Sequence, residues 1–258
     1  IWATQRKAPG AAASGVAAEQ AAIVARWLRC RDAWRPHLDR CRDFVLAGAA
    51  HARGRARAVV LGSGALLDIP LTALAREFRE IVLVDAAQPL HARLLARRLG
   101  NVASLSFSLV DTAARPPVYR SWRDALPPAD YVVASMLLSQ LPPPRARDPG
   151  TAWRRDLIGA ALRDLERGGE AVCLITETAR IVTPPGAPKL REDPLAGIAP
   201  PPALAAWDWA LAPPGEGAGA ASVSLRVAGC LRPAGASRWM LASREQNAVR
   251  TGVGLDLG

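Results

Sequence analysis

Apolar positions in the first part of the chain recur at steps of three and four residues, the period of one helix face. The stripe consists of Ile23, Trp27, Cys30, Trp34, Leu38, Cys41 and Val45. We expect Pro36 to break this segment into two helices, because proline lacks the amide donor that a helix interior needs. The pattern predicts an N-terminal helical cap over residues 17–54. Packing of this cap on the following domain is favoured over a separate role as a binding helix.

From residue 57 onward, short apolar runs alternate with helical patterns. The runs that predict strands cover residues 58–61, 81–84, 105–110, 131–138 and 171–176. They are apolar almost throughout, as expected for strands that are covered on both faces. This alternation, with short connections, predicts an α/β fold with a doubly wound, mostly parallel, Rossmann-like sheet.

The C-terminal part changes character again. Residues 183–206 are rich in Pro and Gly and predict a long loop, whereas residues 207–211, 222–228 and 239–243 predict strands. At least two of these strands should pair as an antiparallel hairpin at the sheet edge. We therefore expect a Rossmann-like domain over residues 55–245 that ends in an antiparallel strand pair. Residues 1–16 and 246–258 are predicted to be tails.

Small and acidic residues follow three of the predicted strands. Gly62, Ser63 and Gly64 end the first strand, Asp85 ends the second, and Asp111 with Thr112 ends the third. Glycines at such a place let the backbone approach a nucleotide-like ligand, and a carboxylate after the second strand can accept hydrogen bonds from ribose hydroxyls. Each feature alone is more often part of a tight turn or cap than of a site. Their order predicts a shared site for adenosine.

On VVLGSG, LVDAAQP, LVDTA and YVVASMLLSQLP, the chain resembles the class I S-adenosylmethionine-dependent methyltransferases over roughly residues 55–245. The resemblance implies that S-adenosylmethionine is the cofactor. It assigns residues 62–64 to the methionine part, Asp85 to the ribose and Asp111 to the adenine. Thr112 offers a neighbouring polar contact. It also implies methyl transfer to an acceptor that the sequence does not identify. An acceptor pocket is expected around Ser135, Ser139 and Gln140, after the fourth strand.

Two positions depart from the pattern of these methyltransferases. Val60 stands where an acidic residue is common, and Leu66 stands where a third glycine often occurs. Asp68 either replaces the missing carboxylate or caps the helix near Pro70, and the cap is the favoured interpretation. A dinucleotide-binding motif would need glycine instead of Leu67, so this competing fold is disfavoured.

No catalytic residue is assigned from the sequence. Solvent-facing positions account for the three histidines, His37, His51 and His91, and Glu177 is a further polar residue after the fifth strand. The missing acidic residue and the absence of a visible base leave an alternative. In it, the chain is an inactive methyltransferase-like subunit with a binding or structural role in an RNA-containing or multiprotein assembly.

Charge and cysteines add little to this prediction. The four cysteines have no spacing typical of a metal site, so no metal is expected. The formal net charge of +10 suits a nucleic acid or protein partner, but a compositional bias toward arginine explains it more simply. No apolar run is long enough to predict a membrane span. We expect a cytoplasmic protein. The alternative is an organelle matrix after removal of a transit peptide, because no acidic residue precedes Glu19.

Overall fold

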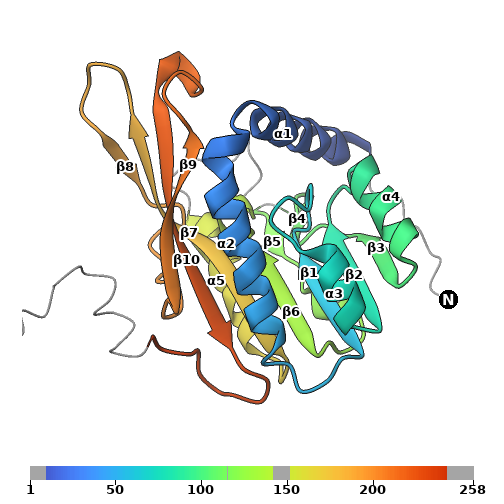
Figure 1. The fold of residues 1–258 in the computed structure, drawn as a ribbon. Coiled ribbons are helices and arrows are strands. Elements are labelled where there is room, and N and C mark those ends of the chain that lie inside the picture. The colour runs from blue at the N-terminus through green and yellow to red at the C-terminus, as the bar shows by residue number, and fades with distance from the viewer. Residues whose placement is uncertain (1–9, 115, 142–151, 243–258) are drawn as a thin grey trace, which may run out of the picture.

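Five apolar segments form the parallel half of one sheet in the computed structural model, which describes residues 10–114, 116–141 and 152–242 (Figure 1). These strands are β1 (Arg57–Leu61), β2 (Glu80–Asp85), β3 (Val102–Ser106), β6 (Tyr131–Ser135) and the first part of β7 (Ala171–Thr183). Two strands continue the sheet antiparallel, β9 (Ala205–Ala212) and β10 (Ser222–Arg232). The order is β3-β2-β1-β6-β7-β10-β9, and β8 (Leu190–Glu192) also pairs with β7. The predicted fold class, including the C-terminal antiparallel pair, is confirmed.

Helices cover both faces of this sheet. On one face lie α2 (Arg31–Ala49), α3 (Leu71–Glu77) and α4 (Leu90–Leu99), and on the other lies α5 (Ala152–Glu166). Alternate residues of β1 show both layers: Val60 belongs to the core under α2 and α3, whereas Val59 and Leu61 belong to the core under α5. This two-sided burial is the physical reason why the parallel strands are apolar throughout rather than alternating.

The N-terminal segment forms two helices, but their boundary differs from the prediction. Helix α1 (Gly10–Arg29) and α2 meet at Cys30, and Pro36 lies inside α2. The prediction that Pro36 ends a helix is therefore wrong. Contacts of α2 with β9 and β7 hold it in place despite the missing amide donor. Helix α1 begins within the predicted tail, and residues 1–9 and 243–258 lie outside the described part.

Several predicted strand boundaries also need correction. β3 ends at Ser106, and the apolar residues after it lead into a separate two-stranded sheet of β4 (Val110–Asp111) and β5 (Val118–Tyr119). β6 ends at Ser135 and is followed by a 3-10 turn at Leu138–Gln140. The expected loop at 183–206 contains β8, and residues 239–242 form no strand. After β3 and β6, hydrophobicity continues past the last residue that pairs in the main sheet.

Candidate functional site

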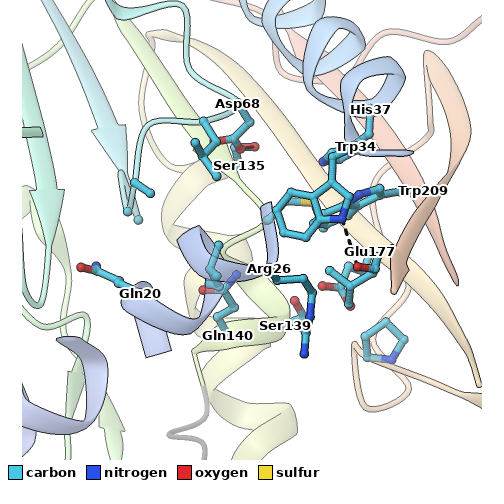
Figure 2. A pocket seen from close by; sticks show the side chains of 18 of the residues that line it. Gln20, Arg26, Trp34, His37, Asp68, Ser135, Ser139, Gln140, Glu177 and Trp209 are labelled. Carbon is cyan, nitrogen blue, oxygen red and sulfur yellow. Dashed lines mark hydrogen bonds between the residues drawn. The ribbon is translucent and has the colours of Figure 1, made fainter. Parts of the chain in front are cut away.

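A cavity of about 610 Å³ opens where the strand order reverses, between β1 and β6. It is lined by residues that follow β1, by Asp85 at the end of β2 and by Ser135 at the end of β6. Helix α1 lies across this edge of the sheet and contributes Gln20 and Arg26 to the lining (Figures 1 and 2). Doubly wound sheets bind their ligands at this place, and the volume suits a small molecule.

The predicted glycine turn forms one end of the cavity. Gly62 and Gly64 have φ angles of +65° and +46°, in the left-handed region that favours glycine. The Gly62 amide donates to the carbonyl of Val84 at 2.8 Å, which ties the end of β1 to β2. A Cβ atom on Gly62 would lie 2.8 Å from Cδ1 of Leu137, so the Leu137 side chain would have to shift. The turn thus depends on glycine at these positions.

Asp85 meets this turn directly. Its Oδ2 accepts a hydrogen bond of 2.7 Å from the Gly64 amide, and its Oδ1 accepts one of 3.2 Å from the Ala87 amide. From α1, the Gln20 amide donates to the same Oδ1 at 3.3 Å. Burial raises the pKa of Asp85, although the amide donors oppose this shift. The structure therefore brings together the predicted residues of the first two strand ends; we refer to residues 62–64 and Asp85 as the glycine-turn end.

Asp111 and Thr112 lie elsewhere. Asp111 belongs to β4 rather than to the end of β3, so its predicted position after the third strand of the sheet is wrong. Its Oδ1 accepts a hydrogen bond of 2.9 Å from the Ala113 amide, as in an Asx turn, and Thr112 is exposed. Neither residue lines the cavity. Their contact with adenine stays a prediction.

The three residues expected in an acceptor pocket, Ser135, Ser139 and Gln140, all line the cavity. The Ser135 hydroxyl donates a short hydrogen bond to the carboxylate of Asp68, and burial raises the pKa of Asp68 (Figure 2). The interpretation of Asp68 as a helix cap is wrong, because Pro70 occupies the N-cap of α3 with no side-chain cap. Its carboxyl group instead faces the cavity, whereas Val60, at the position that is often acidic in the methyltransferases, is buried in the core.

Three aromatic side chains that the sequence analysis did not assign to a site form the opposite end of the cavity, which we call the aromatic end: Trp34, His37 and Trp209. The His37 ring stacks on Trp209, with centroids 3.9 Å apart and planes 2° apart, and Trp34 meets Trp209 edge-on at 4.9 Å. Trp207 Nε1 donates to His37 Nδ1 at 3.0 Å. The prediction of a solvent-facing His37 is wrong, since the ring is buried and this burial lowers its pKa to about 3.

Strained backbone also occurs beside the cavity. Leu66 and Met136 have φ angles of +58° and +52°, a region that non-glycine residues rarely adopt. Met136 lines the cavity, and Leu66 lies between two residues that do. Leu66 occupies the position where a third glycine is common in the methyltransferases, so the left-handed backbone is present without the glycine. Strain of this kind is typical of functional sites.

No family model and no curated protein matches the sequence. Among solved structures, the chain is similar to 1,6-didemethyltoxoflavin-N1-methyltransferase from Burkholderia thailandensis with bound 1,6-didemethyltoxoflavin and S-adenosylhomocysteine. The identity is 16%, the TM-score is 0.44, and the match covers 89% of this chain and 97% of that chain. It is also similar to S-adenosylmethionine-bound CalS10, an amino pentose methyltransferase from Micromonospora echinaspora involved in calicheamicin biosynthesis. That match has 14% identity and a TM-score of 0.34, covering 82% of this chain and 79% of that chain.

The observed strand order, with β10 and β9 antiparallel at the edge, is that of a class I methyltransferase-like fold, as the resemblance in the sequence implied. Among the described residues no helix is long and apolar enough to cross a membrane. That part of the chain also holds no group of histidines, cysteines and carboxylates suited to a metal ion.

Proposed function

We propose that the chain binds S-adenosylmethionine in this cavity and transfers its methyl group to a small-molecule acceptor. The observation that carries the proposal is the hydrogen bond between Asp85 and the glycine turn, at the point where the strand order reverses. It supports a preformed cradle for a nucleoside-like ligand. The cavity volume favours a small acceptor over a macromolecular surface.

The donor and acceptor groups of the glycine-turn end suit this cofactor. Residues 62–64 offer backbone that approaches closely because two of them carry no side chain. Asp85 keeps lone pairs that can accept hydrogen bonds from ribose hydroxyls. A ribose hydroxyl can also replace Gln20, whose hydrogen bond to Asp85 is the longest of the three. Asp68 offers a second carboxylate for a cationic group of the cofactor. It would take the role of the acidic residue that is common in the methyltransferases at the position of Val60. Asp111 and Thr112 remain the proposed adenine contacts.

When bound, S-adenosylmethionine would supply an electrophilic methyl carbon for the acceptor, with its positively charged sulfur as the leaving group. The residues of the chain orient the acceptor and exclude water. Ser139 and Gln140 line the cavity as polar groups for the acceptor, and α1 contributes Gln20 and Arg26 to the lining. Ser135 holds Asp68 in place through the hydroxyl hydrogen bond.

Calorimetric titration with S-adenosylmethionine and S-adenosylhomocysteine tests the proposal. We expect saturable binding that Asp85→Ala abolishes or weakens at least about tenfold, equivalent to about 1.4 kcal/mol. Asp208→Ala is the matched control, because Asp208 is an exposed carboxylate on β9 that pairs with Arg226 and does not line the cavity. Failure of the well-folded wild type to bind either compound would overturn the proposal.

Asp111→Ala in the same titration tests the adenine contact. A several-fold loss of affinity is expected if the carboxylate accepts a hydrogen bond from the cofactor. Unchanged affinity would remove Asp111 from the site. No observation on the described residues favours the alternative of an inactive subunit in an assembly, and this alternative would gain support only from the absence of cofactor binding.

A further inference from the structure

Unpaired buried donors gather at the same cavity. Among the described residues, the buried side-chain polar atoms without a hydrogen-bond partner include Nε of Arg26, Nε of Arg154, Nε1 of Trp209 and Oγ of Ser139, and all four residues line the cavity. Arg154, Trp209 and Ser139 are 8%, 9% and 8% exposed. Buried polar groups are nearly always paired, so such a cluster calls for a partner. Three of the four atoms can only donate, so the partner must carry hydrogen-bond acceptors.

The charge of these groups points to an anion. Neither Arg26 nor Arg154 forms an ion pair within the described part of the chain, and Arg154 spends one Nη2 donor on the carbonyl of Pro194 at 2.8 Å. The nearby acids also have partners, and Glu177, which lines the cavity as well, is not free. Glu192 pairs with Arg180 at 3.4 Å, and the Asp193 carboxylate accepts from the amides of its own loop, Leu195 and Gly197. Two cations thus line the cavity with capacity left for a ligand.

The aromatic end borders the cavity with three fixed rings, of which Trp209 is the most exposed, at 9%. The stack of His37 on Trp209 and the edge contact of Trp34 are held from behind by hydrogen bonds, from Trp207 Nε1 to His37 and from Trp34 Nε1 to the carbonyl of Leu211 at 3.0 Å. Aromatic side chains fixed in this way bind flat π systems by stacking or edge contact at little entropic cost. Figure 2 shows these rings on the side of the cavity away from Gln20, with Arg26 and Ser139 labelled between them.

From these observations we infer that the methyl acceptor is a small, planar aromatic acid. Its ring lies against the aromatic end, and its anionic oxygens receive hydrogen bonds from the unpaired donors of Arg26, Arg154 and Trp209. That this aromatic acid accepts the methyl group rests on the proposed function. The binding of the aromatic acid does not depend on methyl transfer. Asp85 at the glycine-turn end accepts hydrogen bonds, whereas the unpaired atoms of Arg26, Arg154 and Trp209 can only donate them.

The test uses 4-hydroxybenzoate as the probe, titrated into the full chain with and without saturating S-adenosylhomocysteine. Two matched compounds separate the features: 4-hydroxybenzamide keeps the ring without the charge, and cyclohexanecarboxylate keeps the charge without the planar ring. We expect 4-hydroxybenzoate to bind saturably and at least about tenfold more tightly than either. No binding up to about 10 mM, or equal binding of the amide or of the non-planar acid, would overturn the inference.

Variants assign the binding to this end of the cavity. Arg26→Gln is expected to weaken 4-hydroxybenzoate binding at least about tenfold and to change the affinity for S-adenosylhomocysteine less than about threefold. Arg35→Gln, on an exposed arginine of α2 that pairs with Asp32, is the control and should change neither. Trp209→Phe keeps an aromatic ring but removes the Nε1 donor, and should lower the affinity for 4-hydroxybenzoate several-fold. If Arg26→Gln instead lowers the affinity for S-adenosylhomocysteine alone, Arg26 serves the cofactor and the inference fails.

The failures are distinguishable from that of the proposed function. Probe binding without any binding of S-adenosylmethionine would leave the aromatic-acid site standing and overturn the methyl transfer. Binding of S-adenosylmethionine without binding of 4-hydroxybenzoate would overturn the aromatic-acid site and leave the proposed function standing.

Discussion

The carboxylate of Asp85 and the amide of Gly64 are joined by a hydrogen bond of 2.7 Å that links the end of β2 to the turn after β1. This bond fixes the orientation of the carboxylate before any ligand arrives. Because each oxygen of an ionised carboxylate has more than one acceptor position, Asp85 holds the turn and still has capacity for ligand hydroxyls. The same carboxylate therefore holds the turn and, in the proposed function, binds the ribose, so its protonation state should affect both.

Cofactor affinity should depend on the ionisation of Asp85. Burial raises the pKa of this group, so lowering the pH protonates it earlier than an exposed aspartate and removes acceptors for the ribose. We expect the affinity of the wild type for S-adenosylhomocysteine to fall as the pH is lowered through this raised pKa. Asp85→Asn should bind about tenfold more weakly at neutral pH and lose this part of the pH dependence. Titrations of both proteins across the acidic range measure the difference, which also separates Asp85 from Asp68. A pH profile of Asp85→Asn as steep as that of the wild type would contradict the assignment.

Stability should decrease on acidification because of His37. Its pKa is lowered to about 3 by burial, below the usual value near 6.5, so the unfolded chain binds a proton more readily than the folded one. The stabilising contribution is complete above about pH 6.5 and is lost as the pH falls toward 3, at up to about 1.4 kcal/mol per pH unit. Urea denaturation at several pH values should show that the free energy of unfolding of His37→Phe changes less steeply with pH than that of the wild type. His91→Phe, on an exposed ring, should keep the wild-type slope, and equal slopes for all three proteins would refute the prediction.

A buried polar network on α5 should be essential for folding stability. Asp164 is buried and accepts hydrogen bonds from Tyr119 at 2.8 Å and from Ser121 at 2.9 Å, and it pairs with Arg123 at 3.4 Å. Asp164→Ala leaves Arg123 short of a partner and should lower the free energy of unfolding by about 3 kcal/mol. Asp156→Ala on the exposed face of the same helix should change it by less than about 0.5 kcal/mol. Chemical denaturation measures both, and a similar effect of the two variants would show that the network contributes little.

One substitution should stabilise the chain. Ala220, exposed in the turn before β10, has a φ angle of +61° that alanine adopts at a cost. Ala220→Gly should raise the free energy of unfolding by about 0.5–1 kcal/mol, after the entropy cost of glycine is included. The matched change Ala218→Gly, at an exposed neighbour without positive φ, should lower it by about 0.5 kcal/mol. Thermal or urea denaturation that ranks the two variants the other way would contradict the backbone argument.

The glycine turn and Asp85 were predictable because each directly follows a buried strand that hydrophobicity alone delimits. Asp111 was misplaced for the same reason: apolar residues continue after Ser106, so the sequence carries no sign that pairing with β2 stops there. Pairing is decided by hydrogen bonds across the sheet, which hydrophobicity along one strand does not encode. The boundary of β3 depends on this tertiary information.

The aromatic end was not predicted, although part of its signal was present. His37 follows Trp34 by three residues and therefore lies on the same helix face as the apolar stripe. That spacing indicated that His37 is buried, but a polar residue such as histidine is usually expected at the surface. Trp209, in contrast, reaches the cavity only because β9 pairs with β10 and packs against α2. No local pattern connects Trp209 with Trp34, which are 175 positions apart in the sequence.

The two ends of the cavity are built by different parts of the chain. The glycine-turn end comes from the turn after β1 and the last residue of β2, in the parallel half of the sheet. The rings of the aromatic end come from α2 and β9, outside that half. A substitution in α2 or β9 can therefore alter ligand choice while the frame around Asp85 stays intact. Evolution can change the preference of one end without rebuilding the other, and directed variation at Trp34, His37 and Trp209 has the same freedom.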